Sequence, residues 1–427
     1  MSPLREHPWL RGTRLHALVT LATNGLQAGI GLATGVATAR ILGVAGKGEL
    51  ATIQSIGTII VTLGTLGLYE AVVYYAAREP ETGGKDSTAA TAFLLAASIV
   101  FFPLALWAVP RLLPGQRPEV QLGAQHYLFI YPAFVLMGAV QSILRASGRL
   151  LQWNVVRVAI QLSWLAIIIV GSTRAEVRPE ELTTTYMVVL IVLAVVLTVF
   201  YREIWVAGWP PEARRLPRLF RYGLPLFAKT GSRALNVRLD VVVMAAVLTS
   251  DDVGVYAVAA TWSTVLGLLP TALNAVLVPR LASEADPARR QHLERQSLVA
   301  GGAAIVGAAI VLGFAAPVGI PLLFGGAFAS AVPYAVGLLA AGAVLASSQL
   351  MGALVQSRGK TDVLLFAELV GLAATGVGLV TLLPRYGIWG AVITSTLAYA
   401  SAAALIAASL LRRRSPPPPP PEATSPT

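Results

Sequence analysis

Residues 296–357 read QSLVAGGAAIVGAAIVLGFAAPVGIPLLFGGAFASAVPYAVGLLAAGAVLASSQLMGALVQS and hold no charged side chain over 62 positions. A helix crosses the hydrocarbon core of a bilayer with about 20 apolar residues. The stretch is therefore long enough for two crossings, which we expect near 296–316 and 331–356. The turn residues between them are Pro317, Pro321, Gly325 and Gly326.

The whole chain shares this composition. Of its 427 residues 56% are hydrophobic and 12% are charged, and the mean hydropathy is +0.70. Soluble domains carry about 25% charged residues, so this chain is predicted to be an all-α polytopic membrane protein. Its net charge of +11 then reports topology rather than a nucleic-acid partner.

Few residues are available for metal or thiol chemistry. Cysteine is absent, which excludes disulfides, thiolate catalysis and Cys-based metal sites. The four histidines are scattered along the chain, which argues against a His metal cluster. We expect no cofactor.

The charge-free runs, together with two apolar stretches that contain charges, predict twelve transmembrane helices. The two charged stretches are 219–248 and 362–383. The predicted helices lie near 15–39, 48–76, 87–109, 121–144, 152–171, 182–201, 219–248, 253–279, 296–316, 331–356, 362–383 and 386–411.

The distribution of Lys and Arg gives the orientation of these helices. If the N-terminus is cytoplasmic, the connectors on that side hold 21 of the 32 basic residues and those on the opposite side hold 7. Basic residues concentrate in cytoplasmic connectors, so both termini are predicted to be cytoplasmic.

Two pairs of glycines mark an internal repeat. Gly48 and Gly254 precede equivalent helices at an offset of 206, and Gly148 and Gly359 follow equivalent helices at an offset of 211. Parallel repeats of this kind place a substrate path between two halves that open alternately. The predicted divisions are a cytoplasmic segment 1–14, a six-helix lobe 15–201, a cytoplasmic linker 202–218, a second six-helix lobe 219–411 and a disordered Pro-rich tail 412–427.

Four segments resemble one known superfamily. They are ARILGVAGKGEL at 39–50, LFGGAF at 323–328, LVQSRGK at 354–360 and YGIWGA at 386–391. They are similar to the polysaccharide biosynthesis flippases of the MOP superfamily, and the likeness covers nearly all of 15–411. The twelve helices match the O-antigen flippase branch and depart from the fourteen-helix lipid II flippases. The multidrug and toxin extrusion (MATE) branch also has twelve helices.

The resemblance implies a function and a location. Flippases of this kind hold a central cavity between two lobes and move polyprenyl-diphosphate-linked oligosaccharides from the inner to the outer leaflet. The implied location is the bacterial inner membrane, with polysaccharide polymerase machinery as a further partner.

Cations inside the predicted seventh helix are the first candidate binding residues. Lys229 and Arg233 are four residues apart and share a helix face. With Arg238 they are predicted to line the cavity and receive the diphosphate, which Arg binds bidentately. The alternative is a structural pair with a carboxylate on a neighbouring helix.

Three further charges within spans are candidates for ion coupling or gating. Glu368 matches Arg157 at the repeat offset of 211, so Glu368 is a candidate for binding H⁺ or Na⁺ while Arg157 binds the anionic substrate. An inter-lobe salt bridge without ion coupling explains the match equally well. Asp240 either contacts an ion or neutralises a neighbour.

Two other functions compete with the flippase. A MATE multidrug exporter should favour acidic cavities, and the cationic seventh helix argues against it. A membrane enzyme needs a sizeable extracytoplasmic loop, whereas no connector exceeds about twenty residues. We expect that the protein is not an enzyme.

Overall fold

The computed structural model describes residues 8–174, 176–283, 286–358 and 361–411, and within them it is entirely helical apart from short connectors. These residues form sixteen α-helices and four 3₁₀ turns. The first ten helices are α1 (Pro8–Thr65), α2 (Leu68–Arg78), α3 (Gly83–Leu112), α4 (Pro118–Tyr127), α5 (Ile130–Ala146), α6 (Leu150–Gly171), α7 (Pro179–Phe200), α8 (Arg202–Gly208), α9 (Leu216–Asn236) and α10 (Leu239–Val247). The others are α11 (Ser250–Thr264), α12 (Leu268–Ser283), α13 (Pro287–Phe324), α14 (Val332–Ser357), α15 (Thr361–Tyr386) and α16 (Ile388–Leu411).

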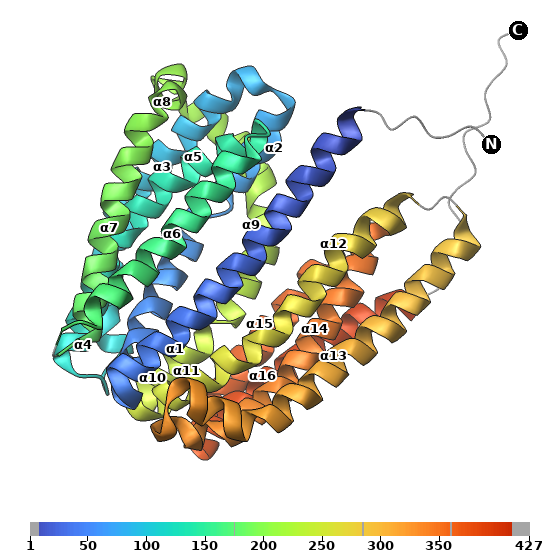
Figure 1. Cartoon of the computed structure of the whole chain (residues 1–427). Helices are drawn as coiled ribbons and strands as arrows, with labels where there is room; N and C mark the ends of the chain where they lie inside the picture. Colours follow the sequence, from blue (N-terminus) through green and yellow to red (C-terminus); the bar gives the residue numbers. More distant parts are fainter. Residues whose placement is uncertain (1–7, 175, 284–285, 359–360, 412–427) are drawn as a thin grey trace, which may run out of the picture.

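The helices form two groups that diverge at one end. Figure 1 shows α2–α8 on one side and α12–α16 on the other, with α1 running between them. We call residues 68–208 the first bundle and residues 250–411 the second bundle. The bundles spread apart toward the end at which α1 begins and α16 ends, and they converge at the other end near α10 and α11. Helix α9 bridges them, since it packs on α2 and on α15.

Within the described residues, ten segments are long and apolar enough to cross a membrane, which makes the chain a multi-pass membrane protein. Two differences separate this number from the predicted twelve. The predicted connector at 40–47 is instead helical, and α1 passes through it with one non-helical residue, Gly43 (φ 69°). The predicted seventh helix is the pair α9–α10, whose charged side chains lower its hydropathy.

The connection after α13 also differs from the predicted one. The helix continues through Pro317 and Pro321 to Phe324, and the chain turns at Gly325, where φ is 111°. Only glycine adopts this conformation without strain. The turn therefore lies about two helical turns later than Pro317.

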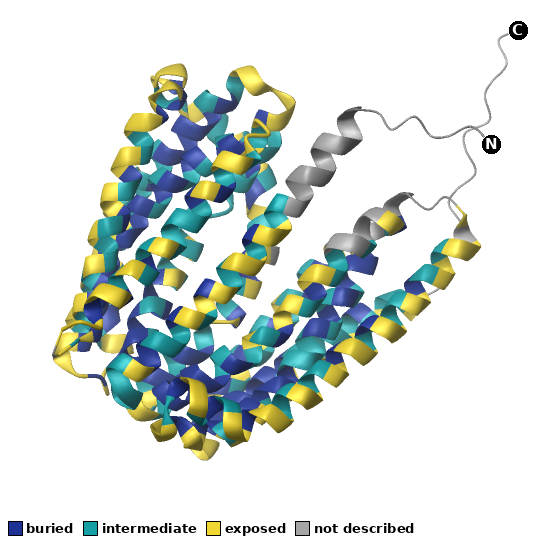
Figure 2. Ribbon diagram, viewed as in Figure 1, coloured by how far each residue is buried: buried dark blue, intermediate teal, exposed yellow. Residues whose placement is uncertain are grey.

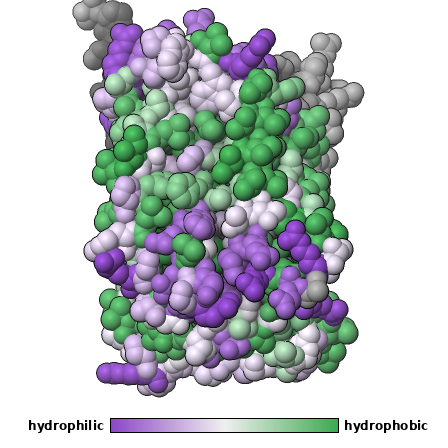
Figure 3. All heavy atoms as spheres, turned by 90° about the vertical axis from the view of Figure 1, so that its left-hand side faces the viewer, coloured by the Kyte–Doolittle hydropathy of each residue, from purple (hydrophilic) through white to green (hydrophobic). Residues whose placement is uncertain are grey.

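The surface of the molecule matches a lipid environment. Large apolar side chains that are more than half exposed include Ile99, Val100, Val199, Phe200 and Phe314. Figure 2 shows buried residues within each bundle and at the end where the bundles converge. Figure 3 shows hydrophobic residues over the upper part of one outer face, with hydrophilic residues gathered below them. Exposed apolar side chains in this number need lipid rather than water around them.

Candidate functional site

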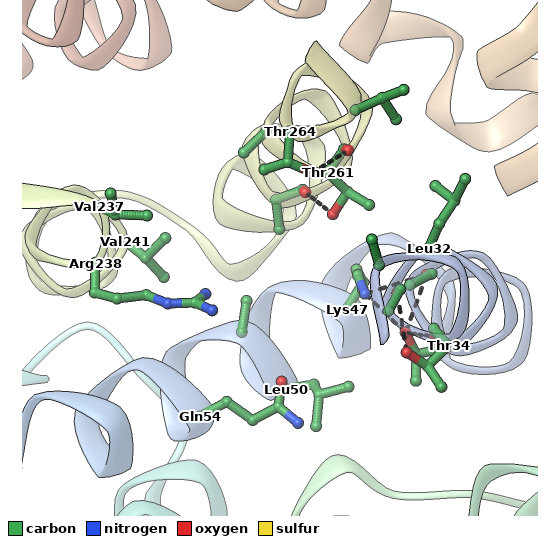
Figure 4. Close-up of a pocket in the computed structure, with 18 of the residues that line it drawn as sticks. Leu32, Thr34, Lys47, Leu50, Gln54, Val237, Arg238, Val241, Thr261 and Thr264 are labelled. Atoms are coloured by element: carbon green, nitrogen blue, oxygen red, sulfur yellow. Dashed lines mark hydrogen bonds between the residues drawn. The ribbon is translucent and has the colours of Figure 1, made fainter. Parts of the chain in front are cut away.

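A cavity of about 620 Å³ lies where α1 meets α10, α11 and α12. Its volume is within the ~300–1,000 Å³ of pockets that enclose small ligands. Glycines, alanines and threonines of α1 form one wall, and Thr261 and Thr264 of α11 form another (Figure 4). Among the described residues, its charged lining groups are Lys47, Arg238 and Asp240.

Lys47 is a buried cation in the wall of this cavity. Its Nζ donates to Thr38 Oγ1 at 2.7 Å and to the carbonyl oxygen of Gly35 at 3.2 Å. The residue is 8% exposed, and no ion pair within the described parts of the chain includes it. A buried cation without a carboxylate is costly. Inside a membrane such a group indicates a binding or transport function.

The kink at Gly43 places Lys47 there. A straight α1 would carry Lys47 away from Gly35, because twelve residues of helix span about 18 Å. The non-helical Gly43 folds the second half of α1 back, so that the ammonium group reaches the carbonyl of Gly35. The two halves of one helix therefore form one cation site.

Arg238 is the second cation of the cavity. It lies at the break between α9 and α10, and Figure 4 shows its guanidinium reaching into the cavity toward Gln54 of α1. Lys47 and Arg238 are within electrostatic range of each other. Two like charges on one cavity attract an anion.

Asp240, the acid of the cavity, is already bonded. Its carboxylate accepts a hydrogen bond from the hydroxyl of Tyr256 and one from the backbone N–H of Val241 at 2.7 Å. The residue is 7% exposed. Asp240 is thus bonded to its own helix and to α11, while the guanidinium of Arg238 reaches into the cavity (Figure 4).

Arg157 lines a different and smaller cavity. Its Nη2 donates to Asn24 Oδ1 at 2.9 Å and its Nη1 to Asn154 Oδ1 at 3.3 Å. The guanidinium carbon lies 4.5 Å from the ring centre of Trp153. This cavity of about 250 Å³ lies between α2, α5 and α6.

The remaining predicted site residues belong to α9 and α15. Arg233 is exposed in the last turn of α9, and Glu368 is half-buried on α15. Arg233, Glu368 and Asp240 are all within electrostatic range of Tyr399 on α16. Lys229 lies on α9, and its side chain is outside the described part of the structure. The structure therefore brings Arg238 and Asp240 to one cavity, Arg157 to another, and Arg233 and Glu368 near Tyr399.

Polar contacts close the end at which the bundles converge. Arg117 donates to both carboxylate oxygens of Glu49, at 2.8 and 2.7 Å. This pairing raises the pKa of Arg117. Gln116 donates to the carbonyl of Ala245 at 2.9 Å and accepts from Ser250 at 2.8 Å. These bonds join the first bundle to α1, α10 and α11.

Arg40 makes a second set of polar contacts at this end. It donates to the carbonyl oxygen of Leu323 at 2.6 Å and to that of Leu322. These carbonyls belong to the last turn of α13, which has no intrahelical donors for them. The first half of α1 is thus bonded to the second bundle as well.

A model of the family described as polysaccharide biosynthesis protein matches residues 13–284. The chain belongs to this family. No curated protein sequence matches the chain.

Solved structures share the fold of this polysaccharide biosynthesis family member. The lipid II flippase MurJ in an inward closed conformation superposes with a TM-score of 0.77 at 13% identity, over 92% of this chain and 87% of that one. An inward-facing multidrug resistance MATE family transporter of the MOP superfamily gives 0.68 at 15% identity, over 91% and 96%. The MATE multidrug transporter DinF-BH gives 0.62 at 16% identity, over 96% and 97%. The fold of the family member is that of MOP-superfamily transporters and flippases.

Sequence reasoning missed Lys47 in this family member. The glycines at 43, 46 and 48 favour a turn, so the sequence predicts Lys47 in a connector outside the membrane. The repeat match between Gly48 and Gly254 is the one indication that the segment is buried.

The bundles spread apart at one end, which we call the open end. There the linker between the two bundles is bonded to the first bundle. Asp86 is fully buried and accepts from Arg215 at 3.2 Å and from Arg218. Arg218 also donates to Glu79 at 3.0 Å, and Arg215 to Glu212 at 2.9 Å. The start of α9 is thereby held on α3.

Proposed function

We propose that this protein moves a polyprenyl-diphosphate-linked oligosaccharide from the inner to the outer leaflet by alternating access, for surface polysaccharide biosynthesis. One observation carries the proposal. The cavity between α1, α10 and α11 holds Lys47, whose ammonium group, among the described residues, donates only to uncharged oxygen atoms.

The chemistry of a diphosphate fits this cavity. Its oxygens accept hydrogen bonds from Lys47, and Arg238 offers a planar fork that binds phosphate oxygens bidentately. The hydroxyls of Thr34, Thr261 and Thr264 line the cavity but already donate to backbone carbonyl oxygens, so the two cations are the donors of this site. Lys229 and Arg233 on α9 then meet the headgroup on its way from the cytoplasm, and Arg157 meets it on the first bundle.

The proposed topology has twelve crossings in two six-helix lobes. Two features support this number. The halves of α1 on either side of Gly43 count as two crossings, and α9 together with α10 counts as one. The uneven distribution of basic residues among the connectors supports a cytoplasmic position, in a bacterial inner membrane, for both termini and for the end at which the bundles spread apart. The described state is then inward-facing, with polysaccharide polymerase machinery receiving the product outside.

Ion coupling is proposed through Asp240 and Glu368. Both acids lie near Tyr399 in the second bundle. Binding of H⁺ or Na⁺ to either acid therefore changes the electrostatic potential at α9, α10 and α16. Export of cationic drugs in the MATE manner is the competing function. Asp240 in the cavity wall favours drug export, whereas Lys47 and Arg238 repel a cationic substrate.

The test is mass spectrometry of polyprenyl-linked glycans in cells depleted of the protein. We expect a complete diphosphate-linked repeat unit to accumulate while the surface polymer is lost, and wild-type protein to reverse both effects. A Lys47→Gln variant should fail to reverse them. The control is Lys85→Gln, because Lys85 is exposed at the open end and pairs with Glu212 at 3.6 Å. Unchanged lipid-linked glycans with new sensitivity to cationic dyes would instead establish drug export.

A further inference from the structure

We infer that the smaller cavity in the first bundle binds a sugar ring of the oligosaccharide, beside the site that receives the diphosphate. The inference rests on the proposed flippase function and adds a second subsite to it. The cavity is lined by Tyr69, Glu70, Gln141, Arg145, Trp153 and Arg157.

The position of this cavity suits a headgroup that hangs from the diphosphate. It is formed by α2, α5 and α6. Helix α2 packs on α9 and α6 packs on α1, and α1 runs between the two bundles (Figure 1). The side chains of Glu70 and Arg145 are each 44% exposed, so the cavity is open to the outside of the protein at these residues.

Two of its lining groups have unused hydrogen-bonding capacity. The amide of Gln141 and the indole N–H of Trp153 make no hydrogen bond with any residue that the structure describes, although both side chains are half-buried. A ligand can bond to such groups without breaking a hydrogen bond within the protein. Sugar hydroxyls satisfy such groups because each one both donates and accepts.

The charges of the cavity favour a neutral ligand over a phosphate. Arg145 pairs with Glu70 at 3.0 Å, which cancels one positive charge and leaves carboxylate oxygens that accept from hydroxyls. Arg157 is bonded to two asparagines and lies over Trp153. Lys47 in the larger cavity has no carboxylate of this kind beside it among the described residues. Each cavity is lined by two cations and one carboxylate, but in the smaller one Arg145 is engaged by Glu70 and Arg157 by two asparagines. The cations of the larger cavity are therefore the better partners for the diphosphate, which leaves the smaller cavity to an uncharged polar group.

The volume limits how much of the glycan enters. About 250 Å³ is below the ~300–1,000 Å³ typical of pockets for drug-sized ligands. The cavity thus accommodates one sugar ring, and the rest of the oligosaccharide stays in the gap between the bundles.

The test compares two lipids on the purified full-length protein by native mass spectrometry. The probes are undecaprenyl diphosphate and the same lipid bearing one N-acetylhexosamine. Wild-type protein should bind the glycosylated lipid more tightly. Gln141→Ala and Trp153→Phe, which remove the free donors, should each reduce this preference by roughly threefold to tenfold, the effect of losing one or two hydrogen bonds. Affinity for undecaprenyl diphosphate should not change.

Matched variants separate the possible failures. Gln161→Ala removes an amide from α6, the helix of Trp153, but Gln161 lies outside the lining of both cavities, and this variant should bind both lipids like the wild type. Lys47→Gln should weaken both lipids equally. If Gln141→Ala and Trp153→Phe keep the full preference, or weaken both lipids alike, the sugar subsite is wrong while the flippase stands. If the wild type binds neither lipid, the flippase proposal fails and the subsite with it.

Discussion

Gly48 of α1 and Gly254 of α11 pack backbone against backbone at the end where the two bundles converge. A Cβ atom on Gly48 would lie 1.9 Å from the carbonyl oxygen of Ser250, and one on Gly254 would lie 2.0 Å from that of Val44. They are one of the two glycine pairs that the internal repeat aligns. The repeated position is therefore a contact between the halves, and only glycine fits on either side of it.

Gly254→Ala should open this contact. Overpacking of a tight interface costs about 1–3 kcal/mol, and the added methyl group meets backbone that cannot rotate away. Because the chain has no cysteine, a single Thr34→Cys in the cavity reports access directly. We expect a membrane-impermeant maleimide added from outside to label Thr34→Cys faster in the Gly254→Ala background. Gly307→Ala on α13, which has no atom within 4 Å of its new Cβ and lies outside the lining of the cavity, should leave the labelling rate unchanged.

The bonds between Arg117 and Glu49 should respond asymmetrically to mutation. The side chain of Glu49 is 5% exposed and that of Arg117 is 57% exposed. Arg117→Gln leaves a buried carboxylate without its partner, whereas Glu49→Gln leaves an arginine that water solvates. Thermal unfolding in detergent should therefore show a larger drop in melting temperature for Arg117→Gln. Equal drops would contradict the buried position of Glu49.

Asp86 provides a three-residue test of the linker contact. Replacing both Arg215 and Arg218 by Gln strands a fully buried carboxylate, which costs about 3–5 kcal/mol. Adding Asp86→Asn to that double variant should restore part of the stability, measured by thermal unfolding. Arg214→Gln is the control, because Arg214 is 81% exposed. A triple variant less stable than the double would show that the buried charge is not the source of the loss.

Acid should weaken the same contact. Hydrogen bonds from Arg214 and Arg215 lower the pKa of Glu212 to about 2, and the hydrogen bond from Arg218 lowers that of Glu79. A carboxylate whose pKa is lowered by folding stabilises the folded state above its unfolded pKa of about 4.3, and this contribution is lost as the pH falls toward the folded value. These groups should not change the melting temperature between about pH 8 and 5, and they should lower it below about pH 4. In Glu212→Gln the fall should be smaller, and an unchanged fall would assign it to other groups.

Much of the fold follows from local sequence, because apolar length alone decides whether a helix crosses a bilayer. The runs at 87–109, 152–171 and 386–411 correspond to α3, α6 and α16. The predicted turn at Gly325 is confirmed, and Gly43 separates two helical halves of α1. The prediction is wrong for Pro317 and Pro321, which lie inside α13.

The site is less predictable than the fold. The charges of α9 and α10 are evident as charges in an apolar stretch, but helix rotation is set by packing. Local sequence does not tell that Arg238 reaches the main cavity while Arg157 turns to Asn24 and Trp153. Lys47 becomes visible only through a contact between two parts of one helix.

That contact has a mechanical consequence. Lys47 joins the two halves of α1 across Gly43, so an anion that takes over the hydrogen bonds of its ammonium group also releases the restraint on the bend. Occupancy and curvature are then thermodynamically linked. If the bound anion favours a straighter α1, a straighter α1 must bind the anion more strongly by the same factor. Part of the binding free energy of the substrate can in this way change the bend of α1.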